Sequence, residues 1–332
     1  MEEQIEQQRN INGTNSSRGI VFSIFFSFVL SRIPIGNFLF AIPLIIGTSR
    51  IAKLREVILS FVSVLVLTVV ISAWEAFDAN TDVFSVGMFV FTIFFPVALG
   101  TASAIWCMTR FTDLGKKFRF FICGAVASVM AAAFLLVITQ ENVVSSNLKE
   151  TLKSGYEVLF ANGFGLSSDA FIEMSIWLFK FVLVPMILVL SGFSIVIAES
   201  MVHKFDWAWQ DSVGKWSIPN DFVWVFLISF FAAIIATVLH LPEIVNVVLW
   251  NLALVTALVY GIQGFAILVF RARKGNPYFM VNRLAGLVAF LALIPGFNLV
   301  VIIGFPLLGV LETWIVFRKP NKENSYENHF ES

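Results

Sequence analysis

Long runs of apolar residues, each about as long as a lipid bilayer is thick, fill most of this 332-residue chain. A helix needs about 20 apolar residues to cross the hydrocarbon core, which is about 30 Å thick. Hydrophobic residues make up 58% of the sequence and charged residues only 13%, a balance that excludes a soluble globular domain. The sequence therefore predicts a polytopic membrane protein embedded in the lipid bilayer.

The apolar runs are continuous rather than alternating, which favours helices over the strands of a barrel. We expect an all-α transmembrane helix bundle with eight clear spans and a broken or hairpin N-terminal hydrophobic segment. Six of the spans are expected over residues 57–74, 84–108, 120–139, 171–198, 222–239 and 244–270. The stretch 279–317 is too long for one helix, and Pro295-Gly296 divides it into two further spans.

The first hydrophobic segment is ambiguous because residues 20–30 and 35–47 are each too short to cross the bilayer comfortably. They form either one broken helix or two short helices in a tight hairpin. The resulting organisation is a polar N-terminal tail over 1–19, a single transmembrane domain over 20–317 and a polar tail over 318–332.

Basic residues fall on alternate loops, the pattern of the positive-inside rule. The basic set of loops carries Arg50, Lys53, Arg55, Arg110, Lys116, Lys117, Arg119, Lys204, Lys215, Arg271, Arg273, Lys274, Arg283, Arg318, Lys319 and Lys322. The opposite loops carry only Lys149 and Lys153. We expect a multi-pass protein of the bacterial cytoplasmic (inner) membrane with its C-terminus in the cytoplasm. The side of the N-terminus is left open.

Motifs for catalysis are absent from the sequence. The histidines His203, His240 and His329 lie far apart, and no His, Cys or Glu spacing suggests a zinc site. No Gly-rich phosphate loop and no serine nucleophile elbow occurs. We expect no enzymatic activity, no metal and no cofactor, and any ATP-driven step would need a separate ATPase. A formal net charge of zero argues against binding nucleic acid.

Lys180 is the most unusual residue inside the spans, because an ionisable group is costly in the bilayer. It lies nine residues into the span 171–198, with Glu173 seven residues earlier on the same helix face. A water-filled cavity that opens outward and is lined by both residues would account for the pair. A lysine satisfied by carbonyl groups of a neighbouring helix accounts for it equally well.

The span 244–270 carries Asn251, Tyr260 and Gln263, with Gly261 and Gly264 beside them. Interhelical hydrogen bonds and close glycine packing explain this pattern, and contact with a polar substrate is the alternative. Near the basic end of the last span, Glu312 is better explained by a salt bridge to a nearby arginine than by a ligand role. The candidate ligand-binding residues are therefore Glu173, Lys180, Asn251, Tyr260, Gln263 and Glu312.

The C-terminal pattern resembles that of a known family. The run Tyr260-Gly261-Ile262-Gln263-Gly264, a basic loop, two spans and then Gly309, Glu312 and Arg318 are similar to the YybS-like family of bacterial multi-spanning membrane proteins. Glu312 stands where that family more often has Asp. The family has no established function, so the resemblance implies fold and lineage. Such proteins are also distantly similar to the substrate-binding membrane subunits of energy-coupling-factor transporters, a likeness of fold alone.

Two functions follow as expectations. The first is a small-molecule binding or transport subunit without its own ATPase, which takes a small polar or amphipathic ligand. The alternative is a structural or regulatory membrane protein that acts through a partner or scaffold protein. Such a partner would bind the Trp-bearing loop at 205–209 or the C-terminal tail.

Overall fold

The computed structural model describes residues 19–33, 36–49, 51, 53–78, 86–140, 153, 157, 167–294 and 296–318. Every regular element in these ranges is a helix, which confirms the all-α class. The two predicted tails, apart from Gly19 and Arg318, lie outside the described residues.

Within the described residues, four helical segments are long and apolar enough to cross a membrane, which indicates a membrane protein. They are Leu54–Trp74 in α3 (Leu54–Asp78), Ile93–Phe111 in α4 (Val86–Met108) and η2 (Thr109–Phe111), α7 (Ser168–Val202) and α10 (Glu243–Gly275). They coincide with the predicted spans 57–74, 84–108, 171–198 and 244–270. The other apolar helical segments found in the described residues have only 10–17 residues, so eight clear spans are not established.

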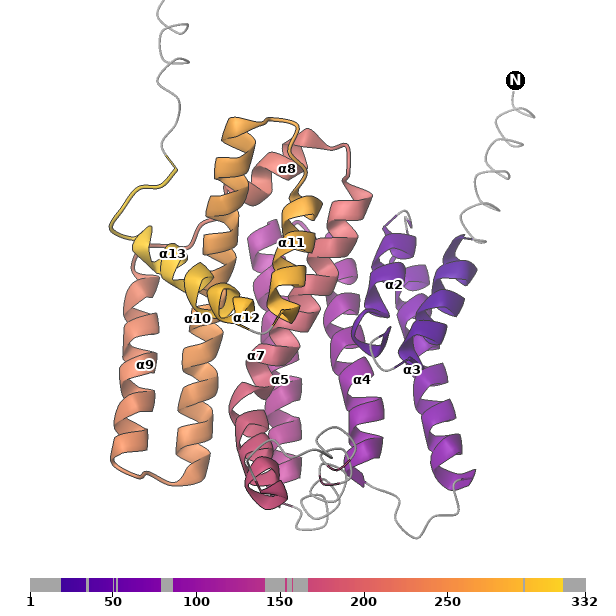
Figure 1. Ribbon diagram of the computed structural model, residues 1–332. Coiled ribbons are helices and arrows are strands. Elements are labelled where there is room, and N and C mark those ends of the chain that lie inside the picture. Colours follow the sequence, from indigo (N-terminus) through magenta and orange to yellow (C-terminus); the bar gives the residue numbers. More distant parts are fainter. Residues whose placement is uncertain are drawn as a thin grey trace, which may run out of the picture. The chain divides into compact units, whose positions relative to one another are not determined.

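Contacts divide the chain into two compact units (Figure 1). Unit 1 comprises Met1–Val202 and Pro242–Asn251, and unit 2 comprises His203–Leu241 and Leu252–Ser332. Helix α10 runs through both units, with the boundary after Asn251. The single transmembrane domain over 20–317 stays a prediction beside this division by contacts.

Unit 1 is built around α4, which contacts α3, α5 (Lys116–Gln140) and α7. Its core joins Phe61 of α3, Leu99 of α4, Cys123 of α5 and Ile195 of α7 in one buried cluster. The opposite face of α3 leaves large apolar side chains exposed, namely Leu59, Val62, Val66, Leu67, Val70 and Trp74. Such a face suits contact with lipid rather than water.

The N-terminal segment forms two short helices in a tight hairpin, which confirms the second of the two alternatives. One helix covers Gly19–Ser31 and the other is α2 (Ala41–Thr48), with η1 (Gly36–Phe38) before it. Gly47 lies so close to Ser23 that an added Cβ would collide with the serine side chain. A hydrogen bond between the Ser31 and Thr68 hydroxyls and one from Arg32 to Ser72 fasten the hairpin to α3.

Two basic residues of unit 1, Arg110 and Arg119, take part in its packing. Arg110 donates to the carbonyl oxygens of Thr48, Ser49 and Ile51, where α2 ends. The last carbonyls of a helix have no partner within the helix and attract a cation, so Arg110 caps α2. Arg119 stacks on the Trp106 ring, with its Cζ 4.4 Å from the centroid.

In unit 2, hydrogen bonds hold the short helix α8 (Trp207–Gly214) against neighbouring segments. Asp206 caps this helix by accepting a hydrogen bond from Trp209 N, which lowers the pKa of the Asp206 carboxyl. The buried Gln210 accepts from Val281 N at 2.8 Å. Arg273 Nε donates to Asp211 at 2.7 Å. These contacts tie α8 to the end of α10 and the start of α11 (Val281–Leu293).

A helical hairpin of α9 (Phe222–Val238) and α10 follows α8 (Figure 1). His240 lies in the turn between the two helices and has φ 51°. The chain then enters α11 (Val281–Leu293). Beyond Gly296 come α12 (Phe297–Leu299), the π-helix η3 (Val300–Gly304) and α13 (Phe305–Leu311).

The C-terminal stretch is a hairpin of two short arms, and neither arm is long enough for a full span. The first arm, α11, has 13 residues, and the second runs over Phe297–Leu311. At about 1.5 Å per residue each arm rises only about 20 Å, less than a hydrocarbon core about 30 Å thick. The turn predicted at Pro295-Gly296 is found at Gly296, which has φ +88°. The two complete spans predicted around it are not established.

We expect the turn of this hairpin to be out of reach of reagents outside the cell, since α11 has 13 residues and rises only about 20 Å from the basic loop before it. With Cys107 and Cys123 replaced by alanine, the variant Phe297→Cys should resist a membrane-impermeant maleimide added to intact cells. His240→Cys, in the turn between α9 and α10, is the matched control and should be labelled. Equal labelling of the two cysteines would support the two full spans that the sequence predicts.

Candidate functional site

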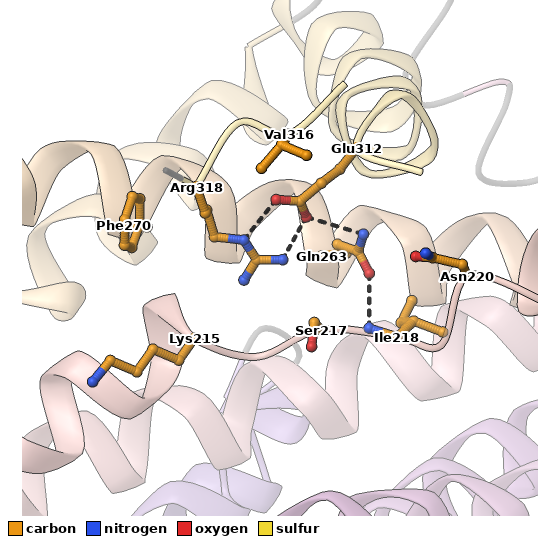
Figure 2. A pocket seen from close by; sticks show the side chains of 9 residues that line it. All are labelled: Lys215, Ser217, Ile218, Asn220, Gln263, Phe270, Glu312, Val316 and Arg318. Atoms are coloured by element: carbon orange, nitrogen blue, oxygen red, sulfur yellow. Dashed lines mark hydrogen bonds and ion pairs between the residues drawn. The ribbon is translucent and has the colours of Figure 1, made fainter. Parts of the chain in front are cut away.

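Gln263 is the centre of a buried polar cluster in unit 2. Its side chain is 5% exposed, and its Oε1 accepts from Ile218 N at 2.9 Å. Its Nε2 donates to the carbonyl of Gly309 at 3.2 Å and to Glu312 Oε2 at 3.1 Å (Figure 2). One amide thus joins α10, the segment after α8 and the end of α13. The interhelical hydrogen bonding predicted for Gln263 is confirmed.

Glu312 forms a two-pronged ion pair with Arg318 (Figure 2). The side chains are 11% and 13% exposed, so both charges are largely withdrawn from water. Arg318 Nη1 also donates to the carbonyls of Gly214 and Trp216, at 2.9 and 2.7 Å. Gly214 is the last residue of α8, where a cation satisfies unpaired carbonyls. The predicted salt bridge from Glu312 to an arginine is confirmed.

Close backbone contact between α10 and α13 brings these side chains together. A Cβ added to Gly264 would collide with the carbonyl of Phe305, and one added to Gly309 would collide with the carbonyl of Tyr260. Only glycine permits helices to approach so closely. Tyr260 itself is 1% exposed and packs its ring against Phe226 at 5.4 Å between centroids. Its observed role is therefore to fill the core beside the cluster.

A cavity of about 410 Å³ lies beside this cluster, entirely within unit 2, and we call it the Gln263 cavity. It is lined by Lys215, Ser217, Ile218, Asn220, Gln263, Phe270, Glu312, Val316 and Arg318. Figure 2 shows the segment with Lys215, Ser217 and Asn220 on one wall, and α10 with the C-terminal segment on the other. Charged, amide and hydroxyl groups therefore face apolar side chains across a single cavity.

Lys180, in unit 1, pairs with Glu243 at the start of α10. The Lys180 Nζ lies 2.7 Å from Glu243 Oε1, with side chains 19% and 63% exposed. Lys180 thus reaches a carboxylate that is itself exposed. Glu173, which was expected to line an outward cavity together with Lys180, is an exposed residue of α7.

Asn251, also in unit 1, inserts its amide into the backbone hydrogen bonding of α7. Its Nδ2 donates to the carbonyl of Lys180 at 2.9 Å, and its Oδ1 accepts from Val184 N at 3.2 Å. In a regular α-helix the Val184 N–H donates to the Lys180 carbonyl four residues earlier. Pro185 follows at once, and a proline inside a helix disturbs the turn before it. Asn251 thus satisfies the backbone groups of that turn from a neighbouring helix.

Replacing Asn251 with leucine is expected to destabilise the protein by about 1–3 kcal/mol, because buried backbone groups of α7 lose their partner. The double variant Asn251→Leu/Pro185→Ala tests the cause, since alanine restores the N–H at position 185 and removes the ring that disturbs the preceding turn. The cost of the leucine should then shrink markedly in equilibrium unfolding in mixed micelles. An equal cost in both backgrounds would show that Asn251 acts independently of the proline.

The structure thus gathers Gln263 and Glu312, with the backbone of Tyr260, in unit 2, and Lys180 with Asn251 in unit 1. Sequence reasoning missed the polar residues on one wall of the Gln263 cavity, namely Lys215, Ser217 and Asn220. They come from the irregular segment between α8 and α9, which has no periodicity to read. Ser217-Ile218-Pro219-Asn220, a turn-forming run beside a lysine, was the available signal.

The cluster is suited to binding rather than to proton transfer. The Glu312 carboxylate is engaged by Arg318 and Gln263, so both of its oxygens already accept hydrogen bonds. Within the described residues, no group of three or more His, Cys, Asp or Glu side chains could hold a metal ion. Polar groups with fixed positions beside an apolar wall can orient a ligand by hydrogen bonds and charge.

No protein-family model, curated protein or solved structure matches this chain. The resemblance to the YybS-like family therefore stays a prediction. The residues that carry it, Gln263, Gly264, Gly309, Glu312 and Arg318, lie together in one polar cluster of unit 2.

Proposed function

We propose that this chain is a multi-pass protein of the bacterial cytoplasmic membrane that binds a small polar or amphipathic ligand in the Gln263 cavity. The observation that carries the proposal is the cavity of about 410 Å³ with fixed polar groups on its walls. Ligand sites are typically clefts of about 300–1,000 Å³ with a few placed polar groups.

The basic loops favour a cytoplasmic position for this cavity. Lys215 and Arg318 line it and belong to the set of basic residues that the positive-inside rule assigns to the cytoplasm. The ligand then enters from the cytoplasmic face or from the inner membrane surface. This replaces the outward opening that the pairing of Lys180 with Glu173 suggested.

We further propose that the protein works without catalysis, as a binding or transport subunit. The fully engaged carboxylate of Glu312 supports this role, because it offers neither a free base nor a nucleophile. The sequence has no phosphate-binding loop of the Walker type, so a separate ATPase would supply any ATP-driven step.

One observation favours the alternative, a structural or regulatory protein that acts through a partner or scaffold protein. Phe205, just before α8, and Tyr278, just after α10, are 73% and 74% exposed. Trp207 contacts the Tyr278 ring edge-on. Exposed aromatic side chains are common anchors of protein interfaces and of the membrane–water boundary.

Ligand screening of the purified full-length protein in nanodiscs separates the two functions. A panel of small polar and amphipathic solutes should contain at least one that raises the unfolding temperature. Ser217→Trp fills the Gln263 cavity and should abolish that shift. Ala208→Trp, at an exposed position of α8, should leave the shift intact. Stabilisation that survives Ser217→Trp, or no stabilising solute at all, would favour the structural alternative.

A further inference from the structure

We infer that the Gln263 cavity recognises a phosphate-bearing monoanion, held between Lys215 and Arg318. The inference rests on the proposed ligand-binding function and narrows its ligand class. Such a phosphate belongs either to the headgroup of an acidic phospholipid or to a soluble phosphate ester, and both present the same charged group.

The charges that line the cavity do not cancel. Two cations, Lys215 and Arg318, face one carboxylate, Glu312, and the ion pair between Glu312 and Arg318 accounts for two of the three. Lys215 is exposed, and within the described part of the chain no carboxylate lies within ion-pair distance of it. One positive charge is therefore left, which matches a single negative charge such as that of a phosphodiester.

Arg318 retains a donor for this anion. Four of its five N–H groups are used, by the two oxygens of Glu312 and by the carbonyls of Gly214 and Trp216. The remaining N–H, on Nη2, has no partner among the described residues. Because the pair with Glu312 fixes the guanidinium, this donor is already oriented. Lys215, by contrast, supplies a mobile point charge, a common partner of phosphate.

Size and apolar surroundings favour a phosphate on a larger molecule over a bare carboxylate or chloride. About 410 Å³ is far more than a small inorganic ion fills. Phe270 and Val316 give the cavity an apolar side, and Trp314 and Ile315 next to Val316 are 64% and 52% exposed. Basic pockets beside apolar helix surfaces at the cytoplasmic face are suited to acidic lipid headgroups.

The test uses full-length protein in phosphatidylcholine nanodiscs or detergent, with two monoanionic phosphodiester probes: phosphatidylglycerol and its deacylated, soluble headgroup, glycerophosphoglycerol. Binding is followed by the unfolding temperature and by native mass spectrometry at several salt concentrations. We expect Lys215→Gln to weaken the affinity for the bound probe about fivefold, the usual effect of one cation near a charged surface. Lys204→Gln, an exposed lysine of the same loop region outside the cavity, should leave the affinity unchanged.

Each outcome decides the inference. Binding of phosphatidylglycerol alone, with loss in Lys215→Gln, identifies a lipid headgroup. Binding of glycerophosphoglycerol with the same loss identifies a soluble phosphodiester. No binding of either probe, or equal loss in Lys215→Gln and Lys204→Gln, overturns the inference. A solute from the general screen could bind the wild-type protein, fail to bind Ser217→Trp and keep its affinity for Lys215→Gln. In that case the proposed function stands and the phosphate inference fails.

Discussion

Glu312→Ala is expected to destabilise unit 2 by about 3–5 kcal/mol, the usual cost of removing one partner of a buried ion pair. The variant leaves the Arg318 guanidinium in a largely buried position without its counter-charge. It also removes an acceptor from Gln263, whose amide links three segments. Equilibrium unfolding in mixed micelles of detergent and dodecyl sulfate measures the change.

Two comparisons isolate the cause of this loss. Glu56→Ala removes an exposed carboxylate 3.8 Å from Lys53 and should cost less than about 1 kcal/mol, as exposed pairs do. The double variant Glu312→Met/Arg318→Met removes both charges, so it should be clearly more stable than Glu312→Ala. A double variant as unstable as the single one would mean that the shape of the site, and not its charge, holds unit 2 together.

The sequence predicts the fold class because burial in lipid allows few solutions. Continuous apolar runs without alternation leave only helices, and the four long spans each overlap a predicted run. Run length alone does not predict where a helix stops. Residues 279–317 contain enough apolar residues for two spans, yet the turn at Gly296 and the π-helix η3 leave two short arms. A run of apolar residues fits a short arm as well as a span.

Within the candidate site, sequence reasoning succeeds where an unusual residue needs a partner. A carboxylate and a glutamine inside apolar helices must be satisfied, so Glu312 and Gln263 stand out. Their partners were predicted only by type, because contacts such as Arg318 with the end of α8 depend on how distant segments meet. The same limit explains Lys180. Its partner Glu243 is 63 residues away, and no local spacing favours it over Glu173.

Gly264→Ala and Gly309→Ala are expected to destabilise unit 2 by about 3 kcal/mol each, the upper end of the usual cost of overpacking. In both variants the added methyl group would meet a backbone carbonyl, that of Phe305 or of Tyr260. A flexible side chain could turn aside, but a carbonyl moves only with its helix. The two helices must therefore separate, which stretches the hydrogen bonds from Gln263 to Gly309 and Glu312.

Gly261→Ala provides the matched control, one turn before Gly264 on the same helix. Its added Cβ would lie 3.6 Å from the Pro306 ring, an ordinary van der Waals contact, so this variant should be neutral or slightly stabilising. The sharpest expected difference is in ligand binding. A Gly309→Ala protein that still folds should lose binding in the Gln263 cavity, because Glu312 and Arg318 shift with α13, whereas Gly261→Ala should keep it. Equal stability and equal binding in the three alanine variants would mean that α10 and α13 do not touch through their backbones.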